Sequence, residues 1–409
     1  MSAARAAARP RHLRLVRPVE AIRPRGRRAV AGRRTATLLV GSTAFLTIAG
    51  LIMVLSASSV SAYARFGDSF RYLQRQGAYA AVGVLALILT SRMRYRAWRR
   101  LSLPLLLATL AMLALVLHPA AGVEAYGSSR WFQLGPVTIQ PSELAKLALV
   151  AFAAAILAGR WDRLGDLRQL AIPLLPVLLL VCGMVMLQPD LGTTLILAGT
   201  VFLLLFAAGV RLRYLAASGA LGLVVGMGLI MSADYRRIRF LSFLDPWADA
   251  GNTGYQLIQS LIALGSGGWT GVGLGASRQK WMYVPNAHTD FIFSILGEEL
   301  GLLGEIVVLV AFGVLLYAGI RTAAHAGDVF GRLLAAGIVS WFGLQALVNL
   351  GAVTGLLPIT GVPLPFLSYG GSSLVVSLAA VGILVNIARS PAGEGAGVRS
   401  VPRRRSRAA

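Results

Sequence analysis

The chain has 409 residues, of which 56% are apolar and only 13% are charged, and its mean hydropathy is +0.70. This balance excludes an ordinary soluble domain and predicts a membrane protein that crosses the bilayer many times. The net charge of +23 does not indicate nucleic-acid binding, because it is concentrated in short segments beside apolar runs. Residues 1–34 hold eleven arginines and residues 92–100 hold five more, as is typical of cytoplasmic flanks.

Apolar runs close to the roughly 20 residues that a transmembrane helix needs recur along the chain. The predicted spans are 36–56, 77–91, 101–118, 140–158, 171–188, 191–210, 213–232, 302–320, 333–351 and 371–388. We therefore expect an all-α polytopic membrane protein with about ten transmembrane helices. A long loop, 233–301, separates spans seven and eight.

The basic segment 1–35 has no apolar signal-peptide core and no small-residue cleavage site, so we expect a disordered cytoplasmic tail. The basic segment 390–409 is expected to be a second such tail. With both termini inside, four polar segments face outward: 119–139, 187–194, 233–301 and 352–370. Three arginines in the long loop, at 236, 237 and 239, then lie outside. The preference of basic residues for the cytoplasmic side is weaker in long loops, so these three carry less weight in the topology.

The strongest functional signal is a cluster of ionisable residues between Ser277 and Glu305. Its members are Lys280, His288, Asp290, Glu298, Glu299 and Glu305. Charged groups at membrane depth cost about 2.5 to 3.5 kcal/mol each on insertion scales, so such a cluster predicts a functional site. A local hydrogen bond is the favoured interpretation for His288. The two adjacent glutamates are either ligands or structural residues near a helix start.

Only two of the 39 basic residues are lysines, Lys146 and Lys280, and both lie in or beside the outward segments. Lysine presents a compact point charge, which suits a site with one carboxylate partner. Pro141 and Glu143 indicate a helix start, so Lys146 lies one turn inside that helix. Its partner is either Glu143, three residues earlier, or a distant carboxylate from the long loop.

Three other patterns have less specific interpretations. Asp190 is expected to stabilise a helix start. The glycine-rich run 265–275 follows no predicted strand and lacks the Walker lysine, which excludes a nucleotide loop and favours a tight interfacial turn. In the segment 354–374, Ser368 and Ser372 either bind a polar headgroup or cap half-helices.

Five blocks occur in order and together cover nearly everything between the tails. They are GSSRWFQLGPVTIQPSELAK, LQPDLGTT, FLDPWADAGNTGYQLIQSLIALGSGGWTGVGLG, QKWMYVPNAHTDFIFSILGEELG and GLLPITGVPLPFLSYGGSSL. The chain resembles the SEDS family of peptidoglycan polymerases (shape, elongation, division and sporulation) in these blocks. The fourth block is more similar to the division branch, FtsW, than to the elongation branch, RodA.

The resemblance implies a glycosyltransferase that polymerises lipid II at the outer face of the bacterial cytoplasmic membrane, at the division septum. Its implied partners are a class B penicillin-binding protein, which crosslinks the product, and other membrane proteins of the divisome. The family's essential aspartate falls on Asp290, and the lysine proposed to pair with it falls on Lys146.

Glycan polymerisation needs a base near the attacking sugar hydroxyl and cations near the departing pyrophosphate. Asp290 is the candidate base, a role that typically contributes about 10²- to 10⁴-fold. Arg130, Lys280 and Arg237 are candidates for the pyrophosphate charge, with Mg²⁺ or Mn²⁺ as a candidate helper and no metal ligands assigned. His288, Ser368 and Ser372 complete the set of substrate-binding candidates.

Two other functions remain open at this point. A lipid II flippase would also have about ten helices with intramembrane charges and broken segments. The polar residues, however, gather on one side, with no matching inner gate and no clear internal repeat. A non-catalytic scaffold of the division complex is the other alternative.

Overall fold

The computed structural model describes residues 25–118, 123–125, 128–135, 137–281, 283–284 and 287–390. Of the tails predicted at 1–35 and 390–409, residues 1–24 and 391–409 lie outside this range. The helices are α1 (Arg25–Phe66), α2 (Arg71–Arg92), α3 (Ala97–Val116), α4 (Pro141–Gly159), α5 (Leu167–Met186), α6 (Leu191–Ala207), α7 (Leu212–Met231), α8 (Asp234–Leu244), α9 (Tyr255–Gly267), α10 (Ile292–His325), α11 (Val329–Val353) and α12 (Gly371–Arg389).

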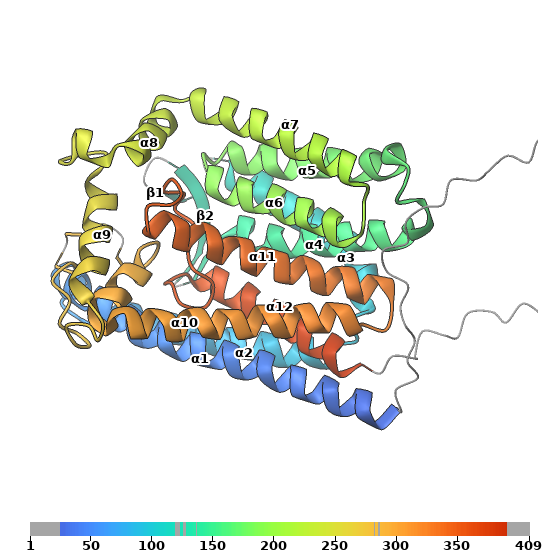
Figure 1. Cartoon of the computed structure of the whole chain (residues 1–409), viewed down its shortest axis with the longest axis horizontal. Coiled ribbons are helices and arrows are strands. Elements are labelled where there is room, and N and C mark those ends of the chain that lie inside the picture. The colour runs from blue at the N-terminus through green and yellow to red at the C-terminus, as the bar shows by residue number, and fades with distance from the viewer. Residues whose placement is uncertain are drawn as a thin grey trace, which may run out of the picture.

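The long helices lie side by side in one bundle (Figure 1), and each predicted span falls on one of them. Eight helices of the described chain are long and apolar enough to cross a membrane. The apolar α6 is shorter, with 17 residues, and α2 begins and ends with arginine. The predicted all-α polytopic membrane fold is confirmed, and α8 and α9 lie within the predicted loop 233–301.

Two predicted boundaries are wrong. Helix α1 begins at Arg25, so residues 25–35 are helical and not part of a disordered tail. Helix α10 begins at Ile292, ten residues before the predicted span 302–320, so the long loop ends earlier than 301. Buried polar contacts stabilise this early part of α10, where Glu298 and Glu299 interrupt the apolar pattern that begins at Phe291.

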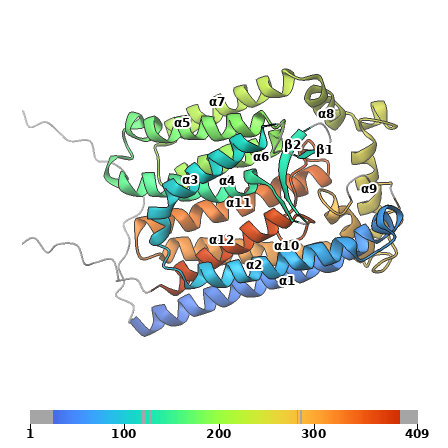
Figure 2. The same ribbon diagram turned by 180° about the vertical axis from the view of Figure 1, so that it is seen from behind.

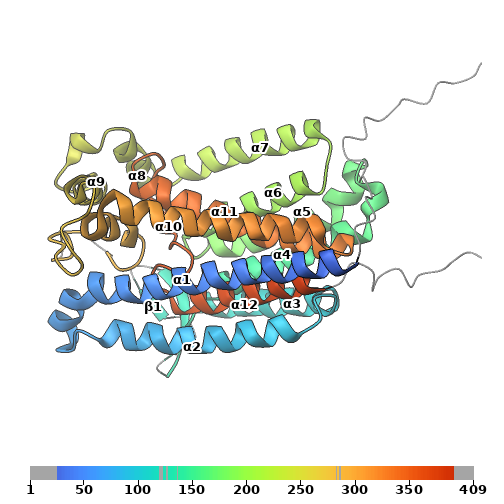
Figure 3. The ribbon, with the colours of Figure 1, turned by 60° about the horizontal axis from the view of Figure 1, so that its bottom comes forward.

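The centre of the bundle is formed by α4, α11 and α12, which carry many of the buried side chains. Helix α2 packs along α12, α1 packs against α10 and α12, and α11 packs against α10, α6 and α4 (Figures 2 and 3). Helix α7 lies at the periphery, and Leu223 and Val224 on it are exposed. An apolar helix with so little protein contact is suited to face lipid.

A small antiparallel sheet lies at one end of the bundle, near α8 and α9 (Figure 1). Its strands β1 (Val123–Ala125), β2 (Ser128–Leu134) and β3 (Val137–Ile139) pair in the order β1-β2-β3, an element that the sequence analysis did not predict. We call this end of the molecule the site end. The last residues of α12 and the first residues of α1 lie at the opposite end.

Helix α10 is broken at Gly301, whose backbone angles are φ 65° and ψ −169°. The glycine-rich segment 268–273 packs into this break. The amides of Val272 and Gly273 donate to the carbonyls of Glu298 and Glu299, each over 3.0 Å. A Cβ at Gly301 would lie 2.4 Å from the amide nitrogen of Gly271, so a side chain does not fit there. This close approach satisfies backbone groups that the break would otherwise leave unpaired.

Candidate functional site

Asp290 lies at the site end, two residues before α10 begins. Its main-chain carbonyl accepts a hydrogen bond of 2.8 Å from Nδ2 of Asn349 on α11. Its side chain faces the loop between α11 and α12, where a Cβ built on Gly361 would lie 3.5 Å from Oδ2. Gly361 has a φ of +72°, a conformation that glycine adopts without strain. The carboxylate is therefore positioned from both sides by elements distant in sequence.

Burial raises the pKa of the Asp290 carboxyl from 3.8 to about 6. The positive charge of Arg239 opposes this rise, Asp190 adds to it, and Arg130 opposes it. Four ionisable groups from α8, β2, the start of α6 and the start of α10 thus interact at one place. A carboxyl with a pKa near neutrality is suited to accept a proton during a reaction.

Asp190 caps the start of α6, accepting hydrogen bonds from the amide and the hydroxyl of Thr193 over 3.0 and 2.9 Å. The predicted structural role of Asp190 is confirmed. Arg130 places Nη1 3.7 Å from Oδ2 of Asp190. Arg130 also donates to the carbonyls of Gln188 and Pro189, over 2.9 and 2.7 Å, which ties β2 to the turn between α5 and α6. Its side chain is partly exposed.

The sequence analysis named Arg237 on α8 as a substrate-binding candidate, but a different arginine of this helix acts on Asp290. Arg237 and Arg239 are both exposed, and it is Arg239 whose charge acts on Asp290. Arg236 lies over the ring of Tyr235, 5.5 Å from its centroid, and its buried Nε and Nη1 have no hydrogen-bond partner among the described residues. The three arginines point in different directions around α8 at 3.6 residues per turn, so sequence alone does not tell which charge acts on Asp290.

Lys146 is buried on α4 and binds Glu143, with Nζ 2.8 Å from the carboxylate. Nζ also donates to Oε1 of Gln345 over 2.9 Å and lies 5.3 Å from the ring centroid of Trp341. The structure therefore forms the local pair that the spacing offered. It contains no ion pair between Lys146 and Asp290 within the described residues.

Lys280 is also buried, and it serves the loop that covers the break in α10. Nζ lies 3.6 Å from Oε1 of Glu299 and donates to the carbonyl of Gly275. Glu299 accepts the hydroxyl of Ser56 on α1 over 2.6 Å. Glu298 accepts the amide of Arg278 over 2.9 Å. The interpretation of both glutamates as structural residues is supported, and Lys280 is a structural residue as well.

The remaining sequence candidates have structural contacts in this conformation. Ser368 accepts the amide of Leu364 over 2.9 Å, and Ser372 accepts the amide of Gln140 over 3.0 Å. His288 packs against Tyr72 and Tyr369, with centroid distances of 4.6 and 5.5 Å. Burial, with a contribution from Arg65, lowers the pKa of the His288 ring to about 4, so it is neutral at physiological pH.

No group of three or more His, Cys, Asp or Glu residues within the described part of the chain is arranged to hold a metal ion. Magnesium in phosphate-transfer sites is often held by one or two carboxylates together with the phosphates of the substrate. Asp290 and Asp190 are the carboxylates at this site whose charges interact.

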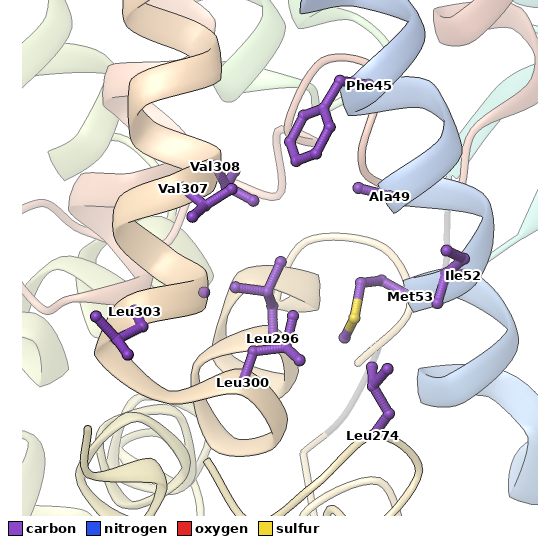
Figure 4. Close-up of a pocket in the computed structure, with 11 residues that line it drawn as sticks. Phe45, Ala49, Ile52, Met53, Leu274, Leu296, Leu300, Leu303, Val307 and Val308 are labelled. Carbon is purple, nitrogen blue, oxygen red and sulfur yellow. The ribbon is translucent and has the colours of Figure 1, made fainter. Parts of the chain in front are cut away.

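An apolar groove of about 360 Å³ lies between α1 and α10, beside the break in α10 (Figure 4). Phe45 and Met53 line it from α1, and Leu296, Leu300 and Val307 line it from α10. None of its lining residues has a charged, hydroxyl or amide side chain, so the groove offers no group that could take part in a reaction. The ionisable groups that interact with one another lie around Asp290.

The family model described as "Cell cycle protein", which covers FtsW, RodA and SpoVE, matches residues 36–392. The chain belongs to this family. It is 48% identical over 342 residues to the probable peptidoglycan glycosyltransferase FtsW of Geobacter metallireducens, which covers 84% of this chain and 91% of that protein. It is 45% identical over 352 residues to stage V sporulation protein E of Bacillus subtilis, covering 86% and 96%.

Solved structures agree with this assignment. A chain from a peptidoglycan synthase complex, studied for its coordination of polymerization and crosslinking, matches with a TM-score of 0.72 and 35% identity, covering 87% of this chain and 98% of that one. The rod shape determining protein RodA of Thermus thermophilus matches with a TM-score of 0.63 and 32% identity, covering 87% and 97%. The resemblance inferred from five sequence blocks is thus confirmed over most of the chain.

Three residues at the site were missed by the sequence analysis: Arg239, Gln345 and Asn349. The last two stand four residues apart in the predicted span 333–351, following Trp341 at the same spacing. Polar side chains at a helical repeat inside an apolar span were a usable signal, because an intramembrane polar group needs a partner.

Proposed function

We propose that this protein is a peptidoglycan glycosyltransferase that polymerises glycan strands from lipid II during cell division. The observation that carries the proposal is the partly buried carboxyl of Asp290, on which the charges of Arg239 and Arg130 act, in a family whose FtsW members are named for this activity. The site end then faces the outside of the cytoplasmic membrane, both termini are cytoplasmic, and the protein works at the septum.

In the proposed reaction a sugar hydroxyl of one substrate attacks the anomeric carbon of another. The new bond joins that oxygen to the carbon, and the bond to the lipid pyrophosphate breaks with its electrons leaving on the phosphate oxygen. Asp290 accepts the hydroxyl proton. Arg130 and Arg239, with Arg236 beside them, stabilise the charge that develops on the pyrophosphate. A divalent cation between the phosphates and a carboxylate would supply further charge stabilisation.

The match to a synthase complex supports a partner that crosslinks the strands. We propose a class B penicillin-binding protein in this role, with other division proteins bound to the same membrane assembly. Lys280 and Lys146 are not assigned to the substrate, because both are buried in ion pairs with glutamates.

The test uses the purified protein with its partner and fluorescent lipid II in detergent or vesicles. Glycan strands should form with the wild type and be lost with Asp290→Ala and Asp290→Asn, while both variants remain folded. Translocation of lipid II without strand formation would instead identify a flippase. Neither activity in an otherwise intact complex would favour a scaffold.

A further inference from the structure

One face of α11 carries a row of polar side chains that reaches from the centre of the bundle to Asp290. Trp341, Gln345 and Asn349 follow one another at intervals of four residues, so they lie along one side of the helix. All three are buried. Buried amide groups are costly unless they are hydrogen-bonded, which makes their partners informative, and within the described residues only Oδ1 of Asn349 in this row has none.

Gln345 occupies the middle of the row. Its Oε1 accepts from Nζ of Lys146 over 2.9 Å and from the indole nitrogen of Trp341 over 2.7 Å. Its Nε2 donates to the carbonyl of Pro363 over 2.8 Å. One amide therefore joins the buried pair of α4 to the loop that faces Asp290.

Asn349 occupies the end of the row. Its Nδ2 donates to two main-chain carbonyls, that of Asp290 and that of Val362, each over 2.8 Å. The carbonyls of Val362 and Pro363 are consecutive, so two amides one helical turn apart hold this loop. The same amide group thus fixes both the backbone that carries the candidate base and the loop beside its carboxylate.

We propose that Asn349 is a positioning residue for Asp290 and that Gln345 connects Lys146 to the same arrangement. Lys146 then supports the reaction through Gln345 and α11 and not through a direct bond to the carboxylate. This inference rests on the proposed function, since it assigns a role relative to the candidate base. Displacement of a reacting group by about 1 Å costs on the order of 100-fold in rate, so a loss of 10- to 100-fold in kcat is expected without Asn349.

The variants are Asn349→Ala and Asn349→Asp, which both remove the two-proton donor, the second with little change in volume. Ser260→Ala is the matched control. Ser260 donates to the carbonyl of Val353 over 2.7 Å and contacts Ser294 over 2.8 Å, so its loss removes a buried hydrogen bond to α11 without touching Asp290. Strand formation from lipid II is measured across pH with each protein.

Both Asn349 variants should lower kcat with KM nearly unchanged. In Asn349→Ala the acidic limb of the pH profile should move to lower pH as water reaches the loosened carboxyl, whereas in Asn349→Asp the added negative charge beside Asp290 should oppose this shift. Ser260→Ala should keep the wild-type profile. A uniform loss of activity at every pH, matched by a lower yield of folded protein, would overturn the inference and reduce Asn349 to a stability residue. Failure of the proposed function is distinguishable, because the wild type would then make no strands.

Discussion

The raised pKa of Asp290 predicts how the reaction rate depends on pH. With a pKa of about 6, roughly 90% of Asp290 is ionised at pH 7 and roughly 10% at pH 5. At the ordinary value of 3.8, more than about nine tenths would still be ionised at pH 5. Because only the carboxylate accepts a proton, kcat/KM, which follows the ionisation of the free enzyme, should fall about tenfold between pH 7 and pH 5.

The charges around Asp290 offer a directional test of this explanation. Asp190→Asn removes a negative charge that raises the pKa of Asp290, so the acidic limb should move to lower pH. Asparagine also caps helices, so α6 keeps its start. Arg130→Gln removes a positive charge that lowers the same pKa, and should move the limb to higher pH.

The assay is strand formation from fluorescent lipid II at constant ionic strength between pH 4.5 and 8. Folding of each variant is checked by its thermal transition in the same detergent at each pH. A wild-type profile that stays flat down to pH 5 would refute the assignment of Asp290 as the base. Shifts of both variants in the same direction would refute the electrostatic reasoning.

Three further predictions concern buried groups near the site end. Lys146→Ala leaves Glu143 charged and unpaired in the core and should cost about 3 to 5 kcal/mol of folding free energy. The double variant Lys146→Met with Glu143→Gln removes both charges and should recover much of the thermal stability. Lys280→Met removes the ion-pair partner of Glu299 and should lower the melting temperature while leaving the KM for lipid II unchanged. A raised KM in a variant of full stability would instead indicate that Lys280 binds the substrate. Gly301→Ala should yield little folded protein in detergent extracts, since its Cβ would overlap backbone atoms, and a normal yield would contradict the tight break in α10.

The course of the chain through the bundle was largely predictable, because each span is an apolar run of membrane length. The early start of α10 was not. Residues 292–301 contain Glu298 and Glu299, which interrupt the apolar pattern, and their partners at 277–280 and Ser56 become visible only in three dimensions. Likewise, the strands β1 and β3, with three residues each, are too short to produce a clear alternating pattern.

The location of the candidate site in the chain could be predicted from the sequence, but many of its side-chain contacts could not. Asp290 and Arg130 were both named as candidates from the sequence, and their charges interact in the structure. The partner of Lys146 could not be chosen from spacing, since a local carboxylate and a distant one were both compatible with it. The structure favours Glu143 because both side chains are buried on the same face of α4, where neither charge can be left alone.

Helix α1 is longer than the hydrocarbon core of a bilayer is thick, so part of it extends beyond the lipid tails. Its 42 residues span about 63 Å at 1.5 Å per residue, about twice the hydrocarbon thickness of a bilayer. Much of this helix must therefore stand in water or among headgroups. Ser56, which binds Glu299, lies only ten residues before the end of α1 at Phe66. If the projecting part is at the site end, Asp290 is held near the height of lipid headgroups, where a sugar attached to a membrane lipid by a pyrophosphate would meet it without leaving the membrane.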